Sequence, residues 1–221
     1  VMERVVGAAR GEHSGVHGTV RVAAPEGFGA QFVAPALARV VDRHPGIVTE
    51  LVTSTRPLAV RGSGQDLTIT VGATHQVRPG SEVLSPYLLR LYASRAYLAG
   101  HPPVESADDL AAHRLVFYVD GLLTVHELDL APVLGGMRVG FGSTSVFAQL
   151  EATRRGAGIG LLHAFMAGSD DALVRVLPEL EFPLQFSLTV RRDAPAVDAV
   201  ALVRDELFAE VAARAGELVP S

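Results

Sequence analysis

The feature that most constrains this chain is a regular alternation of strand-like and helix-like segments, separated by proline and glycine. After a first apolar strand, the turn Pro25-Glu26-Gly27 leads into apolar residues at helical spacing, and His44-Pro45-Gly46 ends that helix. The strands expected in this part are residues 19–24, 47–52 and 67–71. Strands connected through helices pair in parallel, so the pattern predicts an α/β fold.

A second α/β unit follows the first. Its helices are expected after Ser94, at a capping box formed by Ser106 and Asp109, and after Ser143-Thr144-Ser145. Its strands are expected at residues 88–93, 115–119, 137–141 and 159–162, after a less regular connection over residues 73–90. A last strand at 182–190 precedes a final helix at 196–213, whose inward face is expected to carry Val197, Val200, Leu207, Phe208 and Val211. We therefore predict two Rossmann-like lobes joined by two crossing strands, near residues 87–93 and 183–190.

Composition excludes several classes of function. The formal net charge of −5 argues against this chain gripping a nucleic-acid backbone by itself, because such binding needs clustered positive charge. The sequence has neither cysteine nor lysine, so disulfides, zinc–cysteine sites and Schiff-base chemistry are impossible. The first residues lack the pattern of a secretory signal, and no apolar run approaches ~18 residues. We expect a cytoplasmic protein without a membrane span.

Several short motifs, taken in order, resemble one known family. They are Gly18-Thr19-Val20-Arg21-Val22-Ala23-Ala24-Pro25-Glu26-Gly27-Phe28-Gly29, Tyr92-Ala93-Ser94-Arg95-Ala96-Tyr97-Leu98, Asp109-Leu110-Ala111-Ala112-His113-Arg114, Gly156-Ala157-Gly158-Ile159-Gly160-Leu161-Leu162 and Leu177-Pro178. Their order and spacing from about residue 18 to 212 are similar to those of the effector-binding domain of LysR-type transcriptional regulators.

The resemblance implies a periplasmic-binding-protein-like fold of type 2 that binds a small-molecule effector between its lobes. It assigns residues 1–17 to the end of a linker helix, 18–87 plus 188–221 to the first lobe and 88–187 to the second. It also implies a homodimer or tetramer through this domain, with the first helix and the helix after Ser145 as candidate surfaces. DNA contact would come only from an N-terminal winged helix-turn-helix, which lies outside these residues.

Ligands of open α/β sheets bind beyond the carboxyl ends of strands, where helix N-termini offer free N–H groups. The effector-site residues expected on this basis are Glu26, Gly27, Phe28, Ser54, Thr55, Arg56, Gly72, Ser143, Thr144, Ser145 and His163. Each has a plainer alternative: the serines can simply cap a helix, Arg56 can be solvated, and His163 can be a surface histidine.

Two residues depart from the family pattern. Gly27 stands where many relatives carry a hydroxyl residue, and the acidic Glu26 precedes it. Glu26 would suit a helix dipole, but if it points into the cleft it would repel carboxylates and favour a neutral or amine-bearing effector.

Two other classes of protein are alternatives to a regulator's sensing domain. A stand-alone solute-binding protein of the same fold would need an export signal, and an enzyme would need a nucleophile–base pair, which the sequence does not offer. His13 and His17 have the spacing of metal ligands on a helix, but Gly15 and Gly18 disfavour that helix and no third ligand is near. We expect no enzymatic activity, cofactor or metal.

Overall fold

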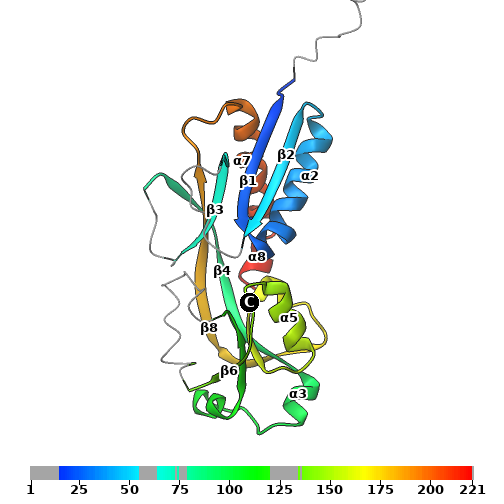
Figure 1. Ribbon diagram of the computed structural model, residues 1–221, viewed down its shortest axis with the longest axis vertical. Helices are drawn as coiled ribbons and strands as arrows, with labels where there is room; N and C mark the ends of the chain where they lie inside the picture. The colour runs from blue at the N-terminus through cyan, green and yellow to red at the C-terminus, as the bar shows by residue number, and fades with distance from the viewer. Residues whose placement is uncertain are drawn as a thin grey trace, which may run out of the picture.

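The computed structural model describes residues 15–54, 64–72, 74, 79–119, 134 and 136–220. These residues form an elongated α/β molecule in which two units are stacked end to end and two long strands run through both (Figure 1). The expected short helix opened by Ser54 to Pro57 lies outside the described residues, apart from Ser54, and so do His13 and most of residues 1–17.

The first unit contains three parallel strands with helices packed against them. Its strands are β1 (Gly18–Pro25), β2 (Ile47–Ser54) and β3 (Leu67–Gly72), and β1 lies between the other two. Its helices are α1 (Glu26–Phe28), the π-helical segment η1 (Gly29–Val33), α2 (Ala34–Arg43) and the late helix α7 (Val197–Ala213). A short helix α8 (Ala215–Leu218) follows α7. The final helix therefore returns to the first unit, as the sequence predicts.

The second unit repeats this arrangement. Its parallel strands are β5 (Arg114–Phe117), β6 (Arg138–Gly142) and β7 (Ile159–His163), with β5 in the middle. Its helical segments are α3 (Arg95–Ala99), the 3-10 helix η2 (Ala107–Ala112), α5 (Val146–Arg154) and α6 (Ala164–Ala167). The predicted capping box at η2 is present, since Asp109 Oδ2 accepts hydrogen bonds from the Ser106 backbone N–H at 2.8 Å and hydroxyl at 2.9 Å.

Two long antiparallel strands, β4 (Ser81–Ser94) and β8 (Leu173–Val190), connect the units. In the first unit β8 pairs with β3, and in the second β4 pairs with β7. The eight strands described therefore form one sheet in the order β2-β1-β3-β8-β4-β7-β5-β6. The lobes are thus hinged by two crossing strands as predicted, but hydrogen bonding continues through the hinge. The expected fold class, two α/β lobes of the periplasmic-binding-protein-like type 2 arrangement, is confirmed.

Three details differ from the expectations. Residues 81–87 were expected in an irregular connection, but they belong to β4, because β8 pairs with them. Val197 was placed on the inward face of the last helix, yet it is 69% exposed because it begins the first turn. Val41 is likewise 42% exposed, whereas Leu37 and Val40 on the same helix are buried.

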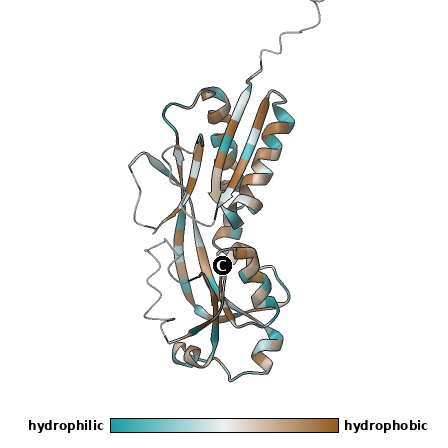
Figure 2. Ribbon diagram, in the orientation of Figure 1, coloured by the Kyte–Doolittle hydropathy of each residue, from teal (hydrophilic) through white to brown (hydrophobic). Residues whose placement is uncertain are grey.

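Hydrophobic residues line the strands and the inner faces of the helices in both halves (Figure 2). The buried side chains form one cluster that runs through the hinge, so Phe32 of the first unit and Phe165 of the second belong to the same core. No helix in the described part of the chain is long and apolar enough to cross a lipid bilayer.

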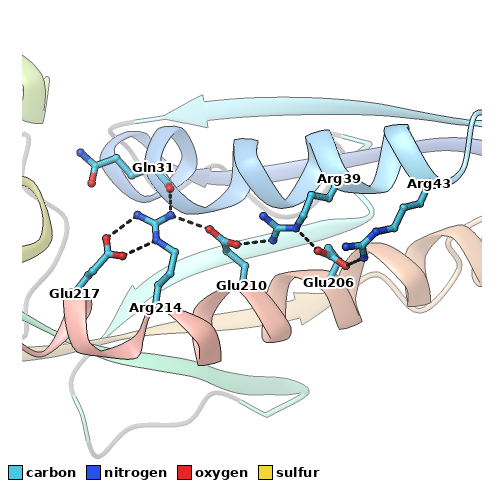
Figure 3. A network of polar contacts seen from close by, with 7 residues as sticks. All are labelled: Gln31, Arg39, Arg43, Glu206, Glu210, Arg214 and Glu217. Carbon is cyan, nitrogen blue, oxygen red and sulfur yellow. Dashed lines mark hydrogen bonds and ion pairs between the residues drawn. The ribbon is translucent and has the colours of Figure 1, made fainter.

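Charged side chains join α7 to α2 in an alternating series (Figure 3). Arg39 pairs with Glu206 and Glu210, and Arg43 also pairs with Glu206 at 3.0 Å. Arg214 donates to Glu210 at 2.8 Å and extends the series toward α8. Because Glu210 is buried and receives two guanidinium groups, this series fixes how α7 lies on the helices that follow β1.

Candidate functional site

Strand ends of the first unit meet helix and strand ends of the second unit near several of the predicted effector residues. Pro25 at the end of β1 lies in register with Ser54 at the end of β2, and Glu26 begins the helical segment directly after β1. Across from them stand Ser143, Thr144 and Ser145, which lead from β6 into α5. Contacts between α1 and α5 bring these two groups together, as the strand-end rule predicts.

Glu26 makes the central polar contact between the units. One carboxylate oxygen, Oε1, accepts a hydrogen bond from the Ser145 hydroxyl at 3.2 Å. The other, Oε2, accepts one from the backbone N–H of Val146 at 2.9 Å. Glu26 therefore supplies a negative charge to the first turn of α5, where free N–H groups and the helix dipole favour an anion.

The local contacts of the serines before α5 are those of a helix cap. Ser145 is the N-cap residue, and its hydroxyl accepts from the Ala148 backbone N–H at 3.3 Å, which is the plain capping role. The Ser143 hydroxyl accepts from the Ser145 N–H at 3.1 Å. Within the described residues, no hydrogen bond to the half-buried Thr144 hydroxyl is found.

Gly27 lies against the second unit without space for a side chain. A Cβ atom at this position would stand 2.7 Å from the Met166 sulfur and 3.1 Å from Val146 Cγ2. A hydroxyl residue at this position would meet these two side chains, so the structure favours glycine here.

Aromatic rings from both units and both hinge strands meet beside this contact. The ring of Phe28 stacks on Phe186 at 4.0 Å between centroids, and Tyr87 stacks on the same ring at 4.1 Å. His163 stacks parallel to Tyr87 at 5.5 Å, and Phe165 lies 5.2 Å from His163. These rings form a buried, apolar cluster beside the junction, here called the aromatic wall.

His163 is a neutral hydrogen-bonding group in this wall. Burial lowers its pKa to about 4, because the surrounding rings disfavour the charged form, although the residue keeps some solvent exposure. Neither ring nitrogen has a hydrogen-bond partner among the described residues. A neutral imidazole of this kind can donate to or accept from a bound molecule.

The sequence reasoning missed Tyr87, Tyr118 and Met166. Burial, with a smaller contribution from the Glu26 carboxylate, raises the pKa of Tyr118 to about 12, so its phenol stays protonated. Tyr118 directly follows β5, and the strand-end rule could have identified it. Tyr87 and Met166 carried no such signal, because one lies within a hinge strand and the other in a short helix.

Four further residues were predicted from the sequence. Gly72 ends β3, and a Cβ placed there would meet open space. Thr55, Arg56 and the side chain of Ser54 lie outside the described part of the structure.

Comparison with known proteins places this arrangement in a class. The fold matches that of CrgA, a LysR-type transcriptional regulator from Neisseria meningitidis, with a TM-score of 0.72 and 22% identity, covering 90% of this chain and 70% of that one. It also matches the full-length Vibrio cholerae virulence activator AphB with a TM-score of 0.70 and 22% identity, covering 88% and 69% of the two chains. The chain thus shares the fold of these two proteins.

The sequence itself matches the family model for the LysR substrate binding domain over residues 13–212. The chain belongs to this family. A curated relative, an uncharacterized HTH-type transcriptional regulator of Haemophilus influenzae, is 25% identical over 179 residues, which is 75% of this chain and 60% of that protein. YhjC of Escherichia coli, also an uncharacterized HTH-type regulator, is 31% identical over 113 residues, or 51% and 38% of the two chains. This chain therefore spans less than two thirds of the length of each of these two curated relatives.

Proposed function

We propose that this chain is the ligand-sensing domain of a LysR-type transcriptional regulator and binds a small-molecule effector between its two units. The observation that carries the proposal is the meeting of strand and helix ends from both units at Glu26 and Ser145. A ligand bound at such a junction contacts both units and so favours one relative arrangement over another. Residues 18–87 with 188–221 would form one lobe, and residues 88–187 the other.

The effector contacts we propose follow from what each residue leaves available. Thr144 and His163 offer side-chain groups that have no hydrogen-bond partner among the described residues. Phe28 contributes to the aromatic wall. Ser143, Ser145, Glu26 and Gly27 shape the junction through the contacts described above, while Ser54, Thr55, Arg56 and Gly72 remain candidates from the sequence alone.

A thermal-shift screen of metabolites against the purified domain tests this function. A compound at 100 times its Kd adds about 2.7 kcal/mol to the free energy of unfolding. We expect the shift to disappear in His163→Phe, which keeps the stacked ring and removes the nitrogens, and to persist in Glu179→Gln on the exposed surface. An effector that stabilises wild type and His163→Phe equally would remove His163 from the site.

We also propose that the domain pairs side by side with a second copy in antiparallel orientation. Exposed apolar residues occur on α2 and the edge strand β2 at one side, namely Val41 at 42% and Val48 at 57% exposure. Others occur on α5 and the opposite edge strand β6, namely Phe147 at 40%, Val139 at 46% and Phe141 at 36%. Surplus apolar surface of this kind is typical of an interface.

Light scattering after size exclusion tests this pairing. We expect wild type to be a dimer at micromolar concentration, and Phe147→Glu to be a monomer because its charge would be buried in the interface. Val197→Glu is the matched control, since Val197 is 69% exposed at the start of α7. A monomeric wild type would contradict the pairing.

In the full-length protein, we propose that an N-terminal domain binds DNA in the cytoplasm and that the effector changes the spacing of two such domains.

A further inference from the structure

The Glu26 carboxylate lies at the N-terminus of α5, where the acid group of a ligand could otherwise bind. Glu26 belongs to the first unit, whereas both of its hydrogen-bond donors, Ser145 and Val146, belong to the second. The two contacts join residues 119 and 120 positions apart in the sequence. They are therefore tertiary contacts across the junction and not a local cap.

The groups around Glu26 are of the kind that would bind a free anion. Its donors are a hydroxyl and a backbone amide at the helix N-terminus, which are the groups that bind carboxylates and phosphates in other proteins. Tyr118 lies close enough for the Glu26 charge to contribute to its raised pKa, and its phenol remains neutral. A second anion at the same place would meet the Glu26 charge without gaining a new donor.

A separate steric observation shows that the junction is closed at this point. The backbone of Gly27 lies against Met166 and Val146, and a Cβ atom there would require these side chains to shift. Polar and apolar contacts between the units therefore coincide at neighbouring residues.

We infer that Glu26 is an internal substitute for an anionic ligand: it holds the two units together before an effector binds and excludes acid groups from the N-terminus of α5. This inference rests on the proposed sensing function only for its consequence, which is that the effector presents no carboxylate or phosphate to α5. Neutral groups such as the His163 imidazole, the Thr144 hydroxyl and the aromatic wall then provide the recognition.

Distance measurements between the units test the first part of the inference. The chain contains no cysteine, so spin labels can be attached at Asp42→Cys on α2 and Asp171→Cys after α6, both exposed, without removing native thiols. We expect a narrow distance distribution with Glu26 present. Glu26→Gln, which is isosteric and uncharged, should broaden it, because the negative charge on the α5 N-terminus is lost. An unchanged distribution in Glu26→Gln would overturn the inference.

Acetate tests the second part, because it can replace the missing side chain of Glu26→Ala. We expect acetate to bind this variant roughly tenfold or more tightly than wild type, to shift the amide resonance of Val146, and to restore the narrow distance distribution. Acetamide, and chloride at equal ionic strength, should do neither. Acetate that shifts the Val146 amide equally in wild type, or acetamide that acts as well as acetate, would overturn it.

The test does not depend on the folding of one variant or on a known effector. If Glu26→Ala does not fold, the Glu26→Gln distances and the titration of wild type with acetate decide the question. Neither measurement uses an effector or DNA, so an effector screen without hits would count against the proposed function and leave this result standing. An acid that binds wild type and shifts the Val146 amide would overturn the inference while supporting the sensing function.

Discussion

The guanidinium group of Arg214 lies over the ring of Phe32, with its central carbon 4.1 Å from the ring centroid. The same group donates to the backbone carbonyl of Gln31 and to the carboxylates of Glu210 and Glu217 (Figure 3). Phe32 in turn stacks on Phe28 at 5.1 Å, which belongs to the aromatic wall of the site. The end of α7 is thus connected to the segment that carries Glu26 and Phe28.

Replacing Arg214 should therefore destabilise the domain. Arg214→Met keeps an apolar stem against Phe32 but leaves the buried Glu210 with Arg39 as its remaining guanidinium partner. Since Arg214 is partly exposed, we expect a loss of roughly 1–2 kcal/mol in the free energy of unfolding, measured by urea denaturation. Arg204→Met is the matched control, because Arg204 also lies over a ring, that of Phe208 at 5.0 Å, but pairs with exposed carboxylates. A loss in Arg204→Met as large as in Arg214→Met would contradict this account.

Acid should weaken the α2–α7 contact through Glu210. Burial alone would raise the pKa of Glu210, but hydrogen bonds from Arg214 and Arg39 outweigh it, and the pKa lies below its ordinary value of 4.5. A lowered carboxyl pKa contributes stability that is present above pH 4.5 and is lost as the pH falls through the folded-state value. We expect urea midpoints measured below pH 4.5 to fall less steeply with acid in Glu210→Gln than in wild type. Equal slopes would show that the Glu210 pKa is not lowered.

His163 should produce a second, distinct pH dependence. Burial lowers its pKa from 6.5 to about 4, so between these values the unfolded chain binds more protons than the folded domain. The contribution of a neutral His163 is therefore complete above pH 6.5 and decreases as the pH falls toward 4. We expect His163→Phe to flatten the stability profile in this window. Proton NMR should show the His163 ring still neutral at pH 5.5, a value chosen inside the window, and a ring protonated near its ordinary pKa would refute the burial argument.

A side chain at position 27 should disrupt the junction. Gly27→Ala places a methyl group against Met166 and Val146, and overpacking of this kind typically costs about 1–3 kcal/mol. Gly72→Ala provides the control, because a Cβ there meets nothing within 4 Å. In Gly27→Ala, shortening the neighbour with Met166→Ala should recover part of the loss. Denaturation of the single and double variants measures this coupling, and strictly additive effects would argue against direct contact.

The periodicity of the sequence was sufficient to predict the parallel part of each unit. The spacing of apolar residues and the boundary residues Pro, Gly and Ser predicted β1, β2, α2 and α5 to within a few residues. The early part of β4 and the early part of β8 were missed. These two segments pair with strands far away in the sequence, and such pairing leaves no local pattern.

The strand-end rule also located both partners of the central contact, Glu26 and Ser145. It could not say that they touch, because that depends on how one unit is oriented on the other. The same limit applies to Gly27, whose importance comes from Met166 in a short helix far along the chain. Local patterns predict which residues face a junction, whereas the hinge geometry decides which of them meet.

The pairing of β4 with β8 through both units restricts how the two units can move. Its register shifts at two places, between Val83 and Ser85 and between Arg90 and Leu91. Two nearly extended strands cannot lengthen much, so we expect the units to change their relative angle more readily than their separation. A ligand at the Glu26 junction would then report its presence as a change of angle between the two ends of the molecule, with little change in their separation along that axis.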